Sequence, residues 1–167
     1  MVLRGGVSSP LKVMWELERE YPFERFERFF TVTYLLVDTA QGRVRYSSAA
    51  HPPPLLVPRE GPARLLREGG PLLGLGMVED MEEGEVVLSP GDRLVLYTDG
   101  AFELTGPDGT LFGLERLHAL IEQHRDLDVE RLCAKVLQEL DAWHGGAPAE
   151  DDITLLVLEY RGAEGTQ

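Results

Sequence analysis

The sequence is poor in cysteine and has no long apolar run. Its one cysteine, Cys133, excludes an internal disulfide framework and a zinc site built from several cysteines. The longest apolar runs, such as Leu155–Leu158, are far too short to cross a bilayer, and no basic segment followed by an apolar stretch opens the chain. We therefore expect a cytoplasmic protein that does not bind a membrane.

Basic residues are also scarce. The chain has 16 Lys and Arg against 29 Asp and Glu, a formal net charge of −13. Because no basic patch is present to neutralise phosphates, we expect no nucleic acid partner. An acidic surface is compatible with a bound divalent cation or a basic protein partner. With 167 residues, 43% of them apolar, the chain is long enough to form a hydrophobic core without staples.

The periodic segments predict an α+β fold with a mainly antiparallel sheet. Ser9 followed by Pro10 is typical of a helix start, and helical spacing continues to Tyr21. Amphipathic spacing predicts two more helices, at 114–123 and 129–143. Apolar and β-branched runs predict strands at 29–37, 43–47, 55–57, 85–88, 93–98 and 153–160. Turn residues predict two hairpins, one joining the first two strands and one across Ser89–Asp92.

Two acidic motifs lie where an apolar strand meets a turn. Asp99-Gly100 follows an apolar strand, with Glu103 four residues after Asp99, and Glu150-Asp151-Asp152 precedes the last strand. A carboxylate at a strand end, next to a glycine that permits close backbone approach, is a good arrangement for a hard cation. Each motif alone is also typical of an Asp-Gly turn or a solvated acidic loop. Spacing does not separate the two interpretations.

Four segments in order resemble a known family. The string SPGDRLVLYTDG at 89–100, with Glu103 after it, resembles the "pGDrlllyTDGvtE" signature of the metal-dependent protein phosphatases (PPM, protein phosphatase type 2C), in their SpoIIE/RsbU-like bacterial branch. Residues 46–55 resemble the branch's "yvNAGHpPpl" segment, 70–75 its "G.pLGl" loop and 151–154 its closing "DDiT". The resemblance implies two stacked, mainly antiparallel β-sheets flanked by helices. It predicts a phosphatase domain over 1–161, incomplete at its N-terminus, and a flexible tail over 162–167.

The resemblance also implies a function and a metal centre. Asp99, with Gly100, and Asp151 match family positions that hold two Mn2+ or Mg2+ ions, while Asp152 and Glu103 match an outer or weak-site position. No protein nucleophile is implied, because a metal-activated water attacks the phosphorus. The implied activity is hydrolysis of phosphoserine or phosphothreonine on a regulatory protein. The implied partner is a phosphorylated anti-sigma-factor antagonist.

One departure from the family leaves an alternative open. The branch begins its active site with an early "GDvsGHG" motif whose Asp bridges both metals, and this sequence contains no such segment. Without that ligand we expect one metal or none, and the alternative function is a weakly active or inactive scaffold that binds proteins in partner-switching regulation. Missing strands would expose sheet edges, so we also expect a homodimer or a strand-swapped oligomer.

Smaller departures concern single residues. Ser48 and Ala50 stand where the branch has Asn and Gly, so a left-handed backbone at Ala50 would be strained. His51, beside three prolines, is interpreted as structural rather than as a phosphate contact. Trp15 and Trp143 are interpreted as core anchors, or as partner contacts if exposed.

Overall fold

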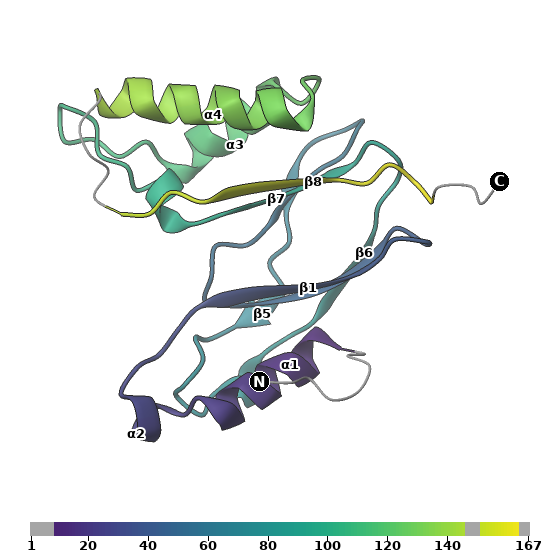
Figure 1. Cartoon of the computed structure of the whole chain (residues 1–167), viewed down its shortest axis with the longest axis vertical. Coiled ribbons are helices and arrows are strands. Elements are labelled where there is room, and N and C mark those ends of the chain that lie inside the picture. The colour runs from purple at the N-terminus through teal and green to yellow at the C-terminus, as the bar shows by residue number, and fades with distance from the viewer. Residues whose placement is uncertain (1–8, 146–150, 164–167) are drawn as a thin grey trace. The chain divides into compact units, whose positions relative to one another are not determined.

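The computed structural model describes residues 9–145 and 151–163 (Figure 1). The chain forms two compact units. The first holds the described residues of 1–53, 66–88 and 162–163, and the second holds those of 54–65 and 89–161. Residues 1–8, 146–150 and 164–167 lie outside the described residues, and with them Glu150 of the second acidic motif and the last four residues of the tail predicted over 162–167.

The helices of the first unit begin and end at identifiable caps. Helix α1 (Pro10–Glu20) starts as predicted, with the Ser9 side chain accepting the Lys12 backbone N–H. Its buried residues include Val13 and Met14. A second, short helix that the sequence did not predict, α2 (Phe23–Phe26), ends at Glu27, whose φ of 51° is left-handed.

The sheet of the first unit is built around β2 (Arg43–Ala49). The first predicted hairpin is confirmed, because β1 and β2 pair antiparallel from Val32↔Ala49 to Asp38↔Arg43. On its other side β2 pairs antiparallel with β6 and, over two residues, parallel with β5. The strands are β1 (Val32–Asp38), β2 (Arg43–Ala49), β5 (Gly69–Gly70) and β6 (Gly84–Val87).

The core of the first unit lies between α1, the sheet and the loop that carries the short helix η1 (Val78–Asp80). Its buried members are Met14, Ala49, Leu73, Val78 and Met81. Glu18, also buried, accepts backbone N–H bonds from Gly74 at 2.7 Å and Gly76 at 2.5 Å. A carboxylate of α1 therefore holds the glycine-rich loop in place, which satisfies buried donors that would otherwise be costly.

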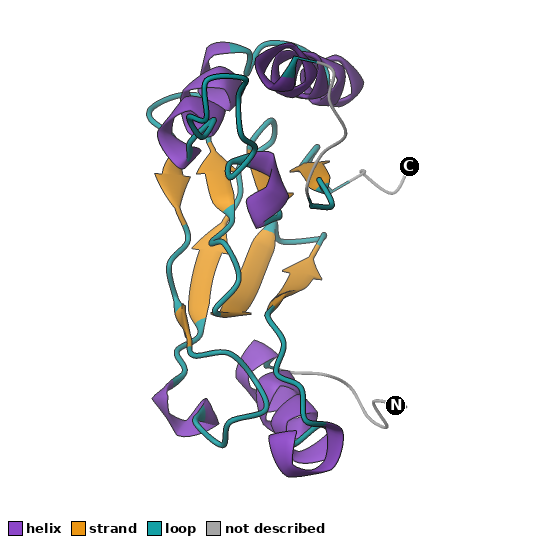
Figure 2. Cartoon of the chain, turned by 90° about the vertical axis from the view of Figure 1, so that its left-hand side faces the viewer, coloured by secondary structure: helices purple, strands orange, loops and turns teal. Residues whose placement is uncertain are grey.

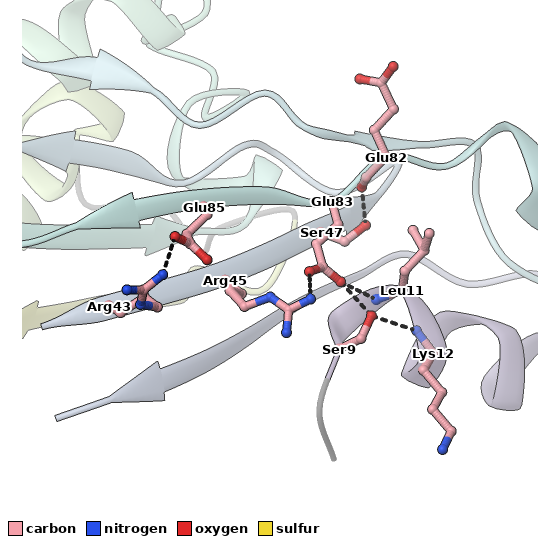
Figure 3. A network of polar contacts seen from close by, with 9 residues as sticks. All are labelled: Ser9, Leu11, Lys12, Arg43, Arg45, Ser47, Glu82, Glu83 and Glu85. Atoms are coloured by element: carbon pink, nitrogen blue, oxygen red, sulfur yellow. Dashed lines mark hydrogen bonds and ion pairs between the residues drawn. The ribbon is translucent and has the colours of Figure 1, made fainter. Parts of the chain in front are cut away.

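Glu83 links α1 to the sheet of the same unit (Figure 3). Its carboxylate accepts the Ser9 hydroxyl at 2.6 Å and the Leu11 backbone N–H at 3.1 Å, and it pairs with Arg45 of β2. Burial raises the pKa of Glu83, but the bonds from Ser9, Leu11 and Arg45 outweigh it and hold the pKa below the ordinary value. The charged carboxylate thus fixes the start of α1 on the sheet.

The second unit is a sheet covered by two helices. Within the described residues its strand order is β4-β3-β7-β8, with every pair antiparallel. Figure 2 shows the strands of each unit side by side. The elements are β3 (Leu55–Val57), β4 (Arg64–Leu65), β7 (Arg93–Tyr97), α3 (Leu114–Gln123), α4 (Val129–His144) and β8 (Leu155–Glu159).

The core of the second unit joins one face of this sheet to α3 and α4 (Figure 1). Val95 of β7, Ile121 of α3 and Val136 of α4 are each completely buried. Helix α4 begins with the Asp128 side chain accepting the Arg131 N–H and ends at Gly145, whose φ is 71°. Both helices were therefore predicted to within one residue.

The predicted hairpin across Ser89–Asp92 is wrong. β6 pairs with β2, and β7 pairs with β3 and β8. The turn residues do form a turn, since Asp92 N–H donates to the Ser89 carbonyl at 2.9 Å, but the chain leaves one sheet and enters another there.

The two tryptophans differ. Trp15 is 45% exposed, so its interpretation as a core anchor is wrong. Trp143 packs against the core of the second unit. The centres of the Trp143 and Phe112 rings are 5.8 Å apart, and the Arg116 guanidinium carbon lies 3.9 Å from the centre of the Trp143 ring.

Both sheets are mainly antiparallel, which confirms the α+β class. None of the described helices has the length and apolar character needed to span a membrane.

Candidate metal centre

Strand β7 carries Asp99 to the end of the sheet of the second unit. Tyr97, the last residue of β7, pairs with Leu155, the first residue of β8. The chain then turns through a short helix, η2 (Asp99–Ala101). The Asp99 carbonyl accepts the N–H groups of Phe102 at 2.9 Å and Glu103 at 2.8 Å. This tight turn fixes the position of Asp99 relative to the strand.

Thr98 joins the two acidic segments. Its N–H donates to the Thr154 carbonyl at 3.2 Å, and its hydroxyl donates to the Asp152 carbonyl at 2.9 Å. The same hydroxyl accepts the Thr154 N–H at 2.9 Å. The segment at 99–103 and the segment at 151–154 therefore lie side by side, as the sequence interpretation required.

Gly100 allows the closest approach between these segments. It is buried, and a Cβ atom built on it would lie 2.7 Å from the Asp152 carbonyl oxygen. Real Cβ atoms do not come so near to a backbone oxygen. Glycine is thus required here for a close backbone contact.

Three of the five predicted residues share one pocket. Gly100, Glu103 and Asp151 line it together with Leu104 and Thr105, and its volume is about 100 Å³. Glu103 and Asp151 bring two carboxylates to this pocket, and both residues are exposed.

Asp99 and Asp152 are the sequence neighbours of Gly100 and Asp151, but neither of them lines the pocket. The Asp99 carboxylate accepts the Gly100 N–H at 3.2 Å, and the Asp151 carboxylate accepts the Asp152 N–H at 2.7 Å. Asp152 contributes its backbone, through the carbonyl that meets Thr98 and Gly100.

The types of donor atom at this pocket fit a hard divalent cation. Carboxylate and carbonyl oxygens are the ligands that Mg2+ and Mn2+ prefer. The donors fall short in number: over residues 9–145 and 151–163, no group of three or more His, Cys, Asp and Glu side chains is placed to hold a metal. A cation held by these residues alone would depend on water for most of its ligands.

Two histidines support the surroundings of this pocket. His118 of α3 hydrogen-bonds through Nε2 to the hydroxyl of buried Tyr97 at 2.7 Å. His144 of α4 donates from Nδ1 to the carbonyl of Thr105, a pocket residue, at 2.6 Å. Sequence reasoning missed Thr98 and both of these supports. Only the place of Thr98 between a strand and Asp99 could have singled it out.

His51 lies in the first unit. Its Nδ1 is 3.2 Å from the Thr31 hydroxyl. This contact fits the structural interpretation of His51.

The chain is similar in sequence to a known protein family and to individual members of the curated proteins. The SpoIIE family model, described as stage II sporulation protein E, matches residues 8–161. Phosphoserine phosphatase RsbP of Bacillus subtilis is 31% identical over 160 residues, which is 92% of this chain and 38% of RsbP. Protein IcfG of Synechocystis is 29% identical over 133 residues, 80% of this chain and 21% of IcfG. The chain spans well under half the length of both relatives.

Solved structures share the fold. The SiaA PP2C domain of Pseudomonas aeruginosa has a TM-score of 0.79 at 21% identity, over 91% of this chain and 61% of that one. The RsbU and RsbW domains of a Mycobacterium tuberculosis protein have a TM-score of 0.75 at 26% identity, over 95% of this chain and 43% of that one. The SpoIIE phosphatase domain of Bacillus subtilis has a TM-score of 0.61 at 14% identity, over 98% of this chain and 79% of that one. The family match over residues 8–161 and the likeness to RsbP together place this chain in the SpoIIE family, in the SpoIIE/RsbU-like branch of the PPM phosphatases.

Proposed function

We propose that this chain is a metal-dependent protein phosphatase domain of the SpoIIE/RsbU type that hydrolyses phosphoserine or phosphothreonine on a regulatory protein. The observation that carries the proposal is the joining, through Thr98, of Asp99-Gly100 to Asp151-Asp152 in a SpoIIE-family chain. RsbP, a relative, is itself a phosphoserine phosphatase.

In this proposal each acidic residue has a role toward a divalent cation, Mn2+ or Mg2+. The carboxylates of Asp99 and Asp151 and the carbonyl of Gly100 would hold it, while Glu103 and Asp152 would act from the outer positions. A bound cation would supply positive charge to a phosphoryl group and lower the pKa of water. The role of Thr98 is to keep the two carboxylate-bearing segments at a fixed spacing. Structural neighbours of the chain include SpoIIE presoaked with Mn and RsbX in complex with magnesium.

The proposed substrate is a phosphorylated anti-sigma-factor antagonist or a protein like it. Among the chain's structural neighbours are the RsbU and RsbW domains of a Mycobacterium tuberculosis protein and a structure described under the bacterial stressosome, a modular system adapted to control secondary messenger signalling. These neighbours support a role in partner-switching signalling.

A second candidate is a scaffold that binds such proteins and hydrolyses little. It is favoured by the small number of side-chain donors that the described residues gather at the pocket. We accordingly expect low turnover from this chain by itself.

Hydrolysis of p-nitrophenyl phosphate in the presence of Mn2+ tests the proposal. We expect slow, Mn2+-dependent turnover that Asp99→Asn and Asp151→Asn each reduce at least about tenfold, because each removes one charged ligand. Asp126→Asn makes the same charge change at another exposed aspartate of the second unit and is expected to keep the turnover.

Turnover that does not depend on Mn2+, or that both variants leave intact, would contradict the phosphatase proposal. Mn2+ binding without turnover would support the scaffold instead.

A further inference from the structure

Strand β8 forms the outer edge of the sheet in the second unit. Within the described part of the chain it pairs only with β7, from Arg93↔Glu159 to Tyr97↔Leu155 (Figure 1). An open strand edge carries backbone donors and acceptors that favour pairing with another strand.

The pairing at both ends of β8 shows which residues face the open edge. The Thr154 carbonyl accepts from Thr98, and Tyr160 N–H donates to the Asp92 carbonyl at 3.0 Å, so residues 154 and 160 direct their backbone groups to β7. Backbone groups alternate along an antiparallel strand. Leu155, Val157 and Glu159 therefore direct their N–H and C=O groups away from β7.

The side chains at this edge are apolar and accessible. Val157 is buried against the helices, whereas Leu156 and Leu158 are 48% and 39% exposed on the opposite face. No proline and no charge lies between Leu155 and Leu158. The edge thus lacks the residues that natural proteins use to prevent edge pairing.

We propose that β8 pairs with β8 of a second copy of this chain. A closed pair of identical strands is related by a two-fold axis and must run antiparallel. Because the outward backbone groups belong to odd-numbered residues, odd-numbered residues of one copy lie opposite odd-numbered residues of the other. Pairing centred on Val157 sets Leu156 of each copy opposite Leu158 of the other, so the four exposed leucines cover one another.

The charges at the ends of β8 complement this arrangement. Asp151 and Asp152 precede the strand, and Arg161, whose side chain is 82% exposed, follows it. An antiparallel pair brings Arg161 of each copy to the acidic end of the other. A parallel pair would instead bring like charges together, which is unfavourable.

Light scattering on the full chain tests the pairing. We expect a concentration-dependent dimer that Leu158→Lys converts to monomer, because a lysine on this face opposes edge pairing. Val87→Lys is the matched control, since Val87 is a 61% exposed strand residue of the other unit and its change should leave the dimer intact. A chain that stays monomeric up to its solubility limit, or a dimer that Leu158→Lys leaves unchanged, would overturn the proposal.

Two further measurements test the register. Backbone amide exchange followed by NMR should show protection of Leu155, Val157 and Glu159 that grows with protein concentration, while Leu156 and Leu158 are protected at every concentration. Oxidation of a mixture of Leu156→Cys and Leu158→Cys chains should give a disulfide-linked dimer. The parent chain, with Cys133 only, should give none. A dimer whose odd-numbered amides exchange freely would show that this edge is not its interface.

Discussion

At the scale of single residues, Ala50 stands where the family has glycine, and its backbone is strained. Its φ is 47°, one of two left-handed backbones found outside glycine among the described residues. The left-handed region is costly for a residue with a Cβ atom and free for glycine. The strain that the sequence suggested at this position is therefore present in the fold.

Ala50→Gly should raise the free energy of unfolding by about 1 kcal/mol, because it removes the left-handed penalty. Urea denaturation of the variant and the parent measures the difference. Ala142→Gly, at an exposed position inside α4, is the control and should lower stability by about 1 kcal/mol. A loss of stability in Ala50→Gly would contradict the interpretation.

Gly100→Ala should lower stability by about 1–3 kcal/mol, because its Cβ would collide with the Asp152 carbonyl and the backbone would have to shift. Thermal unfolding followed by circular dichroism measures the loss. Gly61→Ala offers a comparison, since Gly61 has φ of 94° but open space, so only the backbone penalty of about 1 kcal/mol applies. Unchanged stability in Gly100→Ala would refute the close contact.

At the scale of elements, β7 and β8 are tied at the end opposite to the acidic pocket by an ion pair. The Arg93 side chain, 9% exposed, donates through Nε and Nη2 to Glu159 at 2.9 and 2.7 Å, and through Nη1 to the Arg125 carbonyl at 2.8 Å. The hydrogen bonds from Arg93 hold the pKa of Glu159 below its ordinary value, although burial partly opposes this.

This ion pair predicts a dependence of stability on pH. Because the folded-state pKa of Glu159 is lowered, its contribution is complete above the ordinary pKa of a glutamate and is lost as the pH falls through the folded-state value. Glu159→Gln should therefore weaken the acid dependence and lower stability at neutral pH by about 1–2 kcal/mol. Urea denaturation from neutral to acidic pH, at low protein concentration, measures both effects.

Glu60→Gln, at an exposed turn position, is the control for this pH series. An acid dependence that is the same in Glu159→Gln and in the parent would exclude this ion pair as its source.

The elements also show where sequence reasoning stops. Helical spacing located α3 and α4 closely, because each buries one face. Continuous apolar runs located β3 and β7, because these strands are buried on both faces. The prediction of a hairpin across Ser89–Asp92 was wrong because turn residues determine that the chain changes direction, but not which strand the next strand pairs with. Leu88 N–H donates to Gly42 while Gly91 N–H donates to Tyr160, so each side of the turn bonds within its own sheet.

At the scale of the whole molecule, the candidate site depends on contacts that no local pattern reveals. Thr98 and Asp152 are 54 positions apart in sequence and are joined by one hydroxyl. The two acidic motifs were visible in the sequence, and the resemblance predicted that they meet. Thr98 could not be predicted as their link, because a strand-end threonine is common and its bonding partners are distant in the chain.

The proposed function requires that the segments around Asp99 and Asp151 bind one divalent cation together. Its most direct test is an NMR titration with Mn2+, whose paramagnetism broadens nearby amide signals. We expect the amides of Gly100, Glu103 and Asp152 to broaden first and together. Asp99→Asn should abolish this selectivity, whereas Asp126→Asn should preserve it. Broadening spread evenly over the exposed acidic residues, or confined to one of the two segments, would contradict the proposed function.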